Sequence, residues 1–125
     1  DLHLSIRRQR QMCIRDSRDR VVSPSHVDDV ARATRHLVTA QAPGGLYHCV
    51  NSGYASWLEV AESLRGLAGL PHAEIRGTNA GDVGLKAQRP KFAALSNQKL
   101  IEAGVPMPSW QAALSRHLGA TGVQR

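Results

Sequence analysis

The sequence lacks the features that mark several large classes of protein. Its only two cysteines, Cys13 and Cys49, belong to no Cys-x-x-Cys pair, which excludes a disulfide framework and favours a reducing cytoplasm. It has no run of about 18 uncharged apolar residues, which excludes a helix that spans a membrane. The six histidines show no metal-ligand spacing such as His-x-x-x-His, so we predict no metal site. With 125 residues, the chain forms one domain at most, which is short for an enzyme that binds both a cofactor and a substrate.

The positive charge is unevenly placed. The net charge of +6 at pH 7 would ordinarily suggest a nucleic acid or an anionic surface as partner. Half of this excess lies in residues 1–20, a segment with no aromatic side chain to stack on bases. Within it, residues 11–17 resemble a string translated from adapter DNA. We therefore predict that residues 1–20 are a disordered or artefactual segment and that nucleic acid is not a partner.

The first regular pattern after this segment is typical of a helix followed by a strand. Ser25 is a candidate N-cap, and residues 42–45, with one proline and two glycines, end the helix. The compact apolar run of residues 46–50 predicts a buried strand, and a turn follows it. The inward helix face is predicted from apolar or small residues at helical spacing: Val27, Val30, Ala31, Thr34, Leu37 and Val38.

Three further helices are predicted from their caps. Ser56 and Glu59 form a capping box that starts a helix, which ends at Gly69. A short helix over residues 97–103 ends at Gly104, and Ser109 caps a last helix over residues 110–118. Residues 73–76 are predicted to form a short strand, residues 78–88 a loop, and residues 119–125 a tail.

No complete active site is visible in this sequence. It contains no Gly-x-Gly-x-x-Gly after a strand, which excludes a dinucleotide or phosphate cradle of that kind. Neither Tyr47 nor Tyr54 belongs to a Tyr-x-x-x-Lys pair, because Asn51 and Leu58 occupy the fourth position after them. We therefore predict no catalytic residue in the chain.

A few polar residues are nevertheless placed where they could hold an anionic or sugar ligand. Arg89 precedes a proline at the end of a glycine-bearing loop, where a guanidinium could bind a diphosphate through two hydrogen bonds. An equally simple interpretation is a surface arginine that pairs with Asp82 or Glu74. His26, with two aspartates after it, opens a helix, where capping is the simpler role and ligand contact the alternative.

Five segments of the chain carry a resemblance to a known family: Ser-Pro-Ser-His-Val-Asp-Asp-Val-Ala from position 23, Gly-Leu-Tyr-His from 45, Ser-Trp-Leu-Glu-Val-Ala from 56, Arg-Pro-Lys-Phe-Ala-Ala-Leu-Ser-Asn-Gln-Lys-Leu from 89, and Trp-Gln-Ala-Ala-Leu from 110. In this order they resemble the C-terminal part of the dTDP-4-dehydrorhamnose reductase family, which belongs to the extended short-chain dehydrogenase/reductases. The resemblance covers residues 21–118 and implies an α/β fold with mostly helices and two or three short strands, part of a Rossmann-like NAD(P)-binding protein. It implies that Arg89 binds the diphosphate of the substrate and that Ser23 and Ser25 lie where the cofactor and substrate halves meet. With His26 from the helix start, these are the four predicted substrate-binding residues.

This resemblance implies a fragment of a cytoplasmic NADPH- or NADH-dependent reductase that makes dTDP-L-rhamnose. The family's glycine-rich loop and catalytic Ser/Thr, Tyr and Lys lie upstream, so the chain should bind no cofactor alone and needs an N-terminal Rossmann half as partner. A homodimer is expected of the full-length protein. The alternatives are another nucleotide-sugar epimerase or dehydratase, or a non-catalytic relative such as a methionine adenosyltransferase regulatory subunit. A third hypothesis, a small basic nucleic-acid-binding domain, rests almost wholly on residues 1–20.

Overall fold

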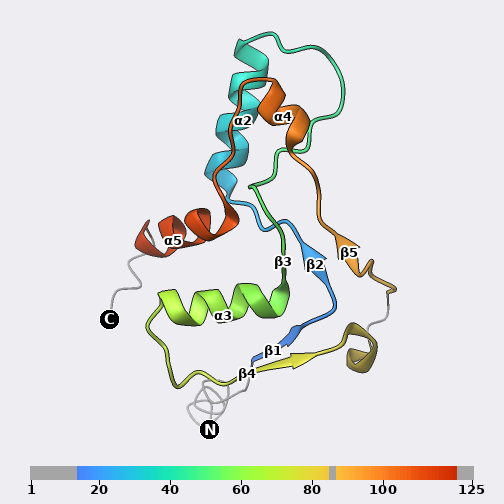
Figure 1. The fold of residues 1–125 in the computed structure, drawn as a ribbon, viewed down its shortest axis with the longest axis vertical. Coiled ribbons are helices and arrows are strands. Elements are labelled where there is room, and N and C mark those ends of the chain that lie inside the picture. The colour runs from blue at the N-terminus through green and yellow to red at the C-terminus, as the bar shows by residue number, and fades with distance from the viewer. Residues whose placement is uncertain (1–13, 85–86, 121–125) are drawn as a thin grey trace, which may run out of the picture.

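The computed structural model describes residues 14–84 and 87–120, and within these ranges it has four α-helices, one 3-10 helix and five short strands. The strands form two small separate sheets, and the helices lie around them (Figure 1). The predicted α/β class is confirmed. The strands outnumber the two or three expected, because three of them have only two residues and leave no periodic pattern in the sequence.

The first sheet pairs two distant segments in parallel. Strand β1 (Ile14–Ser17) lies beside β4 (Ile75–Thr78), and the 3-10 helix η1 (Ala80–Val83) follows β4. The pairing continues past β1, since the Arg18 amide donates to the carbonyl of Thr78 over 2.9 Å. Residues 14–18 of the segment predicted as disordered or artefactual therefore pair with a neighbouring strand, which satisfies backbone groups in this part of it. Residues 1–13 and 121–125 lie outside the described ranges.

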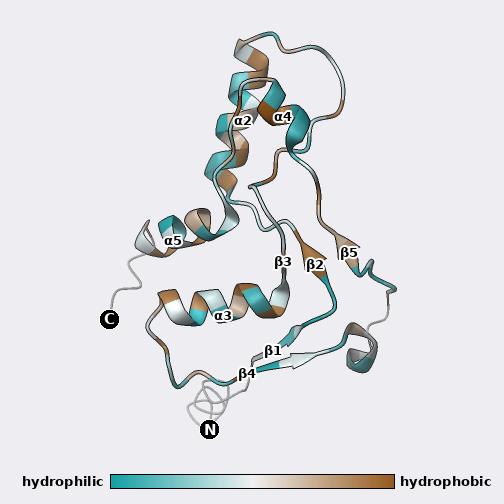
Figure 2. Cartoon of the chain, in the orientation of Figure 1, coloured by the Kyte–Doolittle hydropathy of each residue, from teal (hydrophilic) through white to brown (hydrophobic). Residues whose placement is uncertain are grey.

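The second sheet is three-stranded and has β2 (Val21–Val22) at its centre. Strand β3 (Ala55–Ser56) pairs with it antiparallel, and β5 (Phe92–Ala93) pairs with it parallel. Its central strand is the most hydrophobic of the three (Figure 2). Helix α3 (Trp57–Leu67) begins directly after β3 and also contacts β1 and β4, so it connects the two sheets.

Helix α2 (Val27–Thr39) has a different cap from the one predicted. His26 is the N-cap, and its Nδ1 accepts a hydrogen bond of 3.2 Å from the Asp28 amide. Ser25, the expected cap, instead donates from Oγ to the carbonyl of Ser23 over 3.1 Å. The imidazole reaches the same exposed amide that a serine hydroxyl would satisfy, so a cap is present one residue later.

The predicted inward face of α2 is wrong in part, although Leu37 from that face does pack against the core. Val27 and Val38 are each 72% exposed, whereas Asp29 and Ala33 on another face are buried. The Asp29 carboxylate forms an ion pair with Arg116 from the last helix, which requires that face to point inward. A long-range polar contact of this kind overrides the apolar periodicity.

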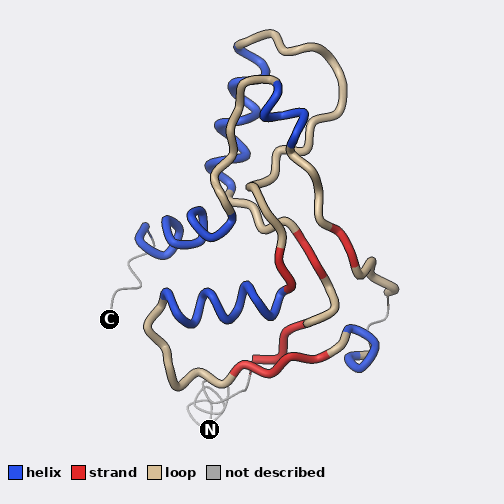
Figure 3. Tube along the Cα trace, viewed as in Figure 1, coloured by secondary structure: helices blue, strands red, loops and turns tan. Residues whose placement is uncertain are grey.

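Residues 46–50 do not form the predicted strand, and Figure 3 shows the segment between α2 and β3 as loop. The segment is half-buried from Tyr47 to Val50, but Leu46 is 75% exposed. Its one internal backbone bond joins the Val50 amide to the His48 carbonyl over 2.9 Å. A strand needs a neighbour for its amides and carbonyls, and no other strand among the described residues lies beside this segment.

The main apolar core lies between α2 and the chain that follows β5. Leu37, Tyr47 and Cys49 are partly buried and pack against this core. The core itself consists of four buried side chains from three segments: Ala33, Leu100, Val105 and Met107. Leu100 belongs to the short helix α4 (Gln98–Glu102), and Gly104, two residues after its end, has the predicted left-handed conformation with a φ of 86°. Helix α5 (Trp110–Ala120) begins where it was expected, after Ser109.

Candidate functional site

The strongest candidate site is a hollow of about 330 Å³ between the start of α2, the helix α5 and one residue of α3. A volume of this size suits a small ligand. Its walls are mostly apolar, with a few polar groups from two histidines and one serine. The lining residues are Pro24, Ser25, His26, Val27, Val60, Trp110, Ala113, Leu114 and His117.

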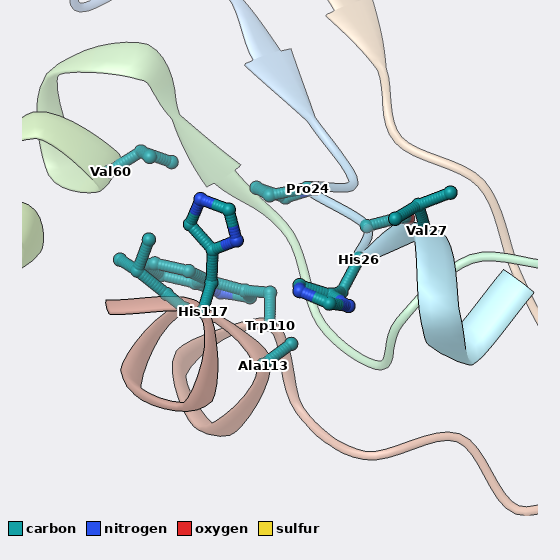
Figure 4. A pocket seen from close by; sticks show the side chains of 9 residues that line it. Pro24, His26, Val27, Val60, Trp110, Ala113 and His117 are labelled. Carbon is teal, nitrogen blue, oxygen red and sulfur yellow. The ribbon is translucent and has the colours of Figure 1, made fainter. Parts of the chain in front are cut away.

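Side chains of α5 face the start of α2 across this hollow. In Figure 4, Trp110, Ala113 and His117 extend from α5 toward Pro24 and His26. The rings of His26 and His117 lie edge to face, with centroids 5.3 Å apart and planes at 63°. Trp110 is only 5% exposed and forms part of the floor. The hollow thus has an aromatic wall with polar ring nitrogens, which is suited to a ligand with both apolar and polar faces.

Asn51 holds the turn that forms one wall of the hollow. Its side chain is 1% exposed, and its Oδ1 accepts a hydrogen bond of 2.7 Å from the His26 amide. The backbone amide of Asn51 donates to Ser25 Oγ over 3.2 Å, and its side-chain Nδ2 donates to the carbonyl of Pro108 over 3.1 Å. One buried side chain therefore joins the start of α2 to the segment that enters α5.

A buried carboxylate lies behind Asn51. Asp29 is 1% exposed and accepts hydrogen bonds from Asn51 Nδ2 over 2.8 Å, from Arg116 over 2.5 Å and from Arg32 over 3.0 Å. Burial raises the pKa of Asp29, but these hydrogen bonds and the two arginine charges outweigh it. The pKa of this carboxyl therefore lies below its ordinary value of 3.8, and the group is a charged anchor beneath the site.

The structure brings together two of the four predicted substrate-binding residues. Ser25 and His26 line the hollow. Ser23 lies outside it and holds the chain after β5, since its Oγ accepts from the Leu95 amide over 2.9 Å. Arg89 also lies outside the hollow and is exposed. Among the described residues, no ion pair engages Arg89, and Glu74, one of its two expected partners, pairs with Arg76 instead.

Sequence reasoning missed the residues that hold the site together. Asn51 was interpreted as a turn residue and Asp29 as a helix-end charge, whereas both are buried and bonded to each other. Arg116 and His117 gave no signal of their own, because nothing local shows that α5 packs on the start of α2. A pair of polar residues beside predicted apolar runs is the one hint that the sequence offers.

A second hollow of about 370 Å³ lies between α3 and the two-stranded sheet. Its walls include Trp57, Leu64 and Ile75, and its charged groups come from Asp16 and Arg65. It contains none of the four predicted residues. We therefore prefer the hollow beside His26 as the candidate site.

The described ranges contain neither a glycine-rich turn at the start of α2 or α3 nor a cluster of metal ligands. Helices α2 and α3 begin at side-chain caps, His26 and Ser56, rather than at a glycine-rich turn. Across the described ranges, no group of three His, Cys, Asp or Glu side chains could hold a metal ion. Within those same ranges, no helix is long and apolar enough to cross a membrane.

Comparisons with known proteins agree with one another. The family model described as the RmlD substrate binding domain matches residues 4–122. The chain is 35% identical over 100 residues to the spore coat polysaccharide biosynthesis protein SpsK of Bacillus subtilis, covering 80% of this chain and 34% of that protein. It is 30% identical over 94 residues to a dTDP-4-dehydrorhamnose reductase of Streptomyces griseus, covering 74% of this chain and 31% of that protein.

The fold is also that of solved structures. A dTDP-4-dehydrorhamnose reductase of Bacillus anthracis in complex with NADP matches with a TM-score of 0.81 and 26% identity, over 95% of this chain and 42% of that chain. The chain spans about a third of the length of the curated relatives it matches. These matches favour neither an epimerase or dehydratase nor a regulatory subunit.

Proposed function

Because this chain belongs to the RmlD substrate binding domain family, we propose that it forms the sugar-nucleotide side of a dTDP-4-dehydrorhamnose reductase acting in dTDP-L-rhamnose biosynthesis. The observation that carries the proposal is the Ser25–His26 turn, which lines a hollow of ligand size inside the matched region. Residues 21–118 are the substrate-binding part in this proposal, and residues 119–125 are a tail.

The polar groups of the hollow are suited to sugar hydroxyls. His26 Nδ1 accepts the Asp28 amide, so a neutral ring carries its proton on Nε2, which is left to donate. Ser25 Oγ donates to one carbonyl and accepts one amide, which leaves an acceptor position on the hydroxyl. We assign both groups to orientation of the sugar, and the apolar wall around Trp110 to its less polar face.

Arg89 is the proposed diphosphate ligand. Its guanidinium is exposed and belongs to no ion pair among the described residues, so it can donate two parallel hydrogen bonds to phosphate oxygens. Ser23 contributes indirectly, because its two hydrogen bonds with Leu95, of 2.9 and 3.4 Å, hold the chain after β5 against β2.

The remaining chemistry belongs to the part that relatives have and this chain does not span. We propose that an N-terminal Rossmann half binds NADPH or NADH and supplies the proton donor, and that the complete protein is a cytoplasmic homodimer. The NADP complex of the Bacillus anthracis reductase supports the cofactor class. In this proposal the chain alone binds no cofactor and turns over no substrate.

Calorimetry with dTDP tests the proposal on the chain as it stands. We expect measurable binding and an affinity about tenfold lower in Arg89→Ala, since a hydrogen bond to a charged group contributes about 1.5–3 kcal/mol. The matched control is Arg35→Ala, an exposed arginine of α2 that should bind dTDP like the parent chain. Absence of dTDP binding would overturn the proposal, as would oxidation of NADPH by the chain alone with a dTDP-4-keto sugar.

A further inference from the structure

Two exposed aromatic side chains meet on the three-stranded sheet, away from the hollow. Tyr54 and Phe92 are 65% and 66% exposed, and their ring centroids are 6.0 Å apart with planes at 65°. They come from opposite edges of the sheet: Tyr54 immediately precedes β3, and Phe92 begins β5. The sequence has only five Phe, Tyr and Trp residues. Two of them are in contact with each other and exposed to solvent, which forms an exposed apolar patch.

The two rings meet edge to face rather than in a closed stack, and we call this exposed pair the aromatic corner. Because both side chains are exposed, a flat ligand can stack on an outer face of either ring. Aromatic pairs favour both offset stacking and edge-to-face contact, so such a corner suits a planar heterocycle. A nucleobase is a heterocycle of this kind, and base stacking on exposed aromatic side chains is a common mode of binding.

Cations border the corner on the β5 side. Arg89 lies three residues before Phe92, a span of at most about 10 Å in an extended chain. Lys91 lies directly beside Phe92, is exposed, and keeps its Nζ 4.0 Å from the Asp19 carboxylate. Arg89 is therefore the less engaged of the two cations. A ligand with a base on the corner can reach Arg89 with a phosphate group.

The chain segments that carry the corner lead to residues of the hollow described above. Tyr54 follows Gly53, where a Cβ atom would lie 3.2 Å from Cδ1 of Trp110, part of the hollow's floor. On the other side, Ser23 follows the central strand and leads directly into Ser25 and His26. The aromatic corner and the hollow are thus joined through two short segments of chain.

From this arrangement we propose that Tyr54 and Phe92 bind the nucleobase of the nucleotide ligand. The inference rests on the proposed function, and it assigns the base to the aromatic corner, the diphosphate to Arg89 and the sugar to the hollow.

The test compares two probes, dTDP and inorganic pyrophosphate, by calorimetry on the full 125-residue chain. Phe92→Leu and Tyr54→Leu keep apolar bulk but remove the ring, and each should weaken dTDP binding roughly tenfold. Pyrophosphate has no base, so its affinity should stay unchanged in both variants and fall in Arg89→Ala. Leu46→Ala, at another residue with a highly exposed apolar side chain, is the matched control and should leave both affinities unchanged.

Conservative variants distinguish loss of the binding contact from loss of folding. Phe92→Tyr and Tyr54→Phe should retain the parent affinity for dTDP, and thermal unfolding of all variants should match that of the parent chain. If dTDP binds with equal affinity to the parent and to both leucine variants, the inference is wrong while the proposed function stands. If neither dTDP nor pyrophosphate binds the parent chain, the proposed function fails first.

Discussion

Nδ2 of Asn51 donates a hydrogen bond of 2.8 Å to Oδ2 of Asp29, and both side chains are 1% exposed. This contact connects the segment before β3 to the first turn of α2. The same Asn51 side chain accepts the His26 amide and donates to the Pro108 carbonyl, so it ties together the walls of the hollow.

Replacement of Asn51 by alanine should destabilise the chain by about 2 kcal/mol, because it leaves buried polar partners unsatisfied. Urea unfolding followed by circular dichroism measures this loss. Asn79→Ala is the matched control, since that asparagine is exposed and makes no side-chain cap bond. An equal, small effect of both substitutions would show that the Asn51 network contributes no stability.

Asp29 should make the stability of the chain depend on pH. Its pKa is lowered in the folded chain, so the carboxylate contributes stability that is present above the unfolded value of 3.8 and is lost as pH falls through the folded pKa. Asp29→Asn should therefore reduce the difference in unfolding free energy between about pH 7 and about pH 3. Asp82→Asn, at an exposed position, should leave that difference intact. The same pH dependence in both variants would argue against a charged Asp29.

The capping box of α3 should contribute about 1 kcal/mol to the free energy of unfolding. Ser56 Oγ accepts the Glu59 amide over 3.2 Å, and Glu59 Oε2 accepts the Ser56 amide over 2.6 Å. Backbone and side-chain hydrogen bonds from Ser56 lower the pKa of Glu59. Ser56→Ala should lower the unfolding midpoint in urea, whereas Glu62→Gln on the exposed side of the same helix should not. An unchanged midpoint in Ser56→Ala would contradict the assigned role.

Replacement by alanine should lower the stability of the chain at Gly104 and raise it at Gly66. Gly104 has φ of 86°, a left-handed conformation that costs a residue with a Cβ about 1–2 kcal/mol. Gly66 lies within α3, and an added Cβ would have no atom within 4 Å. Gly66→Ala should therefore raise the free energy of unfolding by about 0.5–1 kcal/mol. Thermal unfolding of the two variants gives the comparison. A loss at both positions would show that backbone conformation is not the deciding factor.

The sequence predicted what local chemistry determines. The Ser56–Glu59 capping box and the left-handed Gly104 depend on neighbours within a few residues, and the structure contains both. The inward face of α2 was wrong in part, because Asp29 takes its partners from segments that are distant along the chain. Residues 46–50 have the composition of a strand but no neighbour to pair with in the described ranges.

The candidate site was predictable only in part for the same reason. Ser25 and His26 stand out in the sequence, and both line the hollow. Trp110 and His117 come to the hollow through packing of α5 on the start of α2, which no local pattern records. Arg89 stands out at the end of a glycine-bearing loop and also lies in a segment that carries the resemblance, but the structure places it outside the hollow.

A titration of the isotopically labelled chain with dTDP-L-rhamnose, which carries the sugar that dTDP lacks, tests where the sugar binds. We expect NMR shifts at the Ser25 and His26 amides and the Trp110 indole, which line the hollow, and none at the Trp57 indole in the second hollow. No shifts at all, or shifts confined to Trp57 and its neighbours, would contradict the claim that this hollow binds the sugar nucleotide.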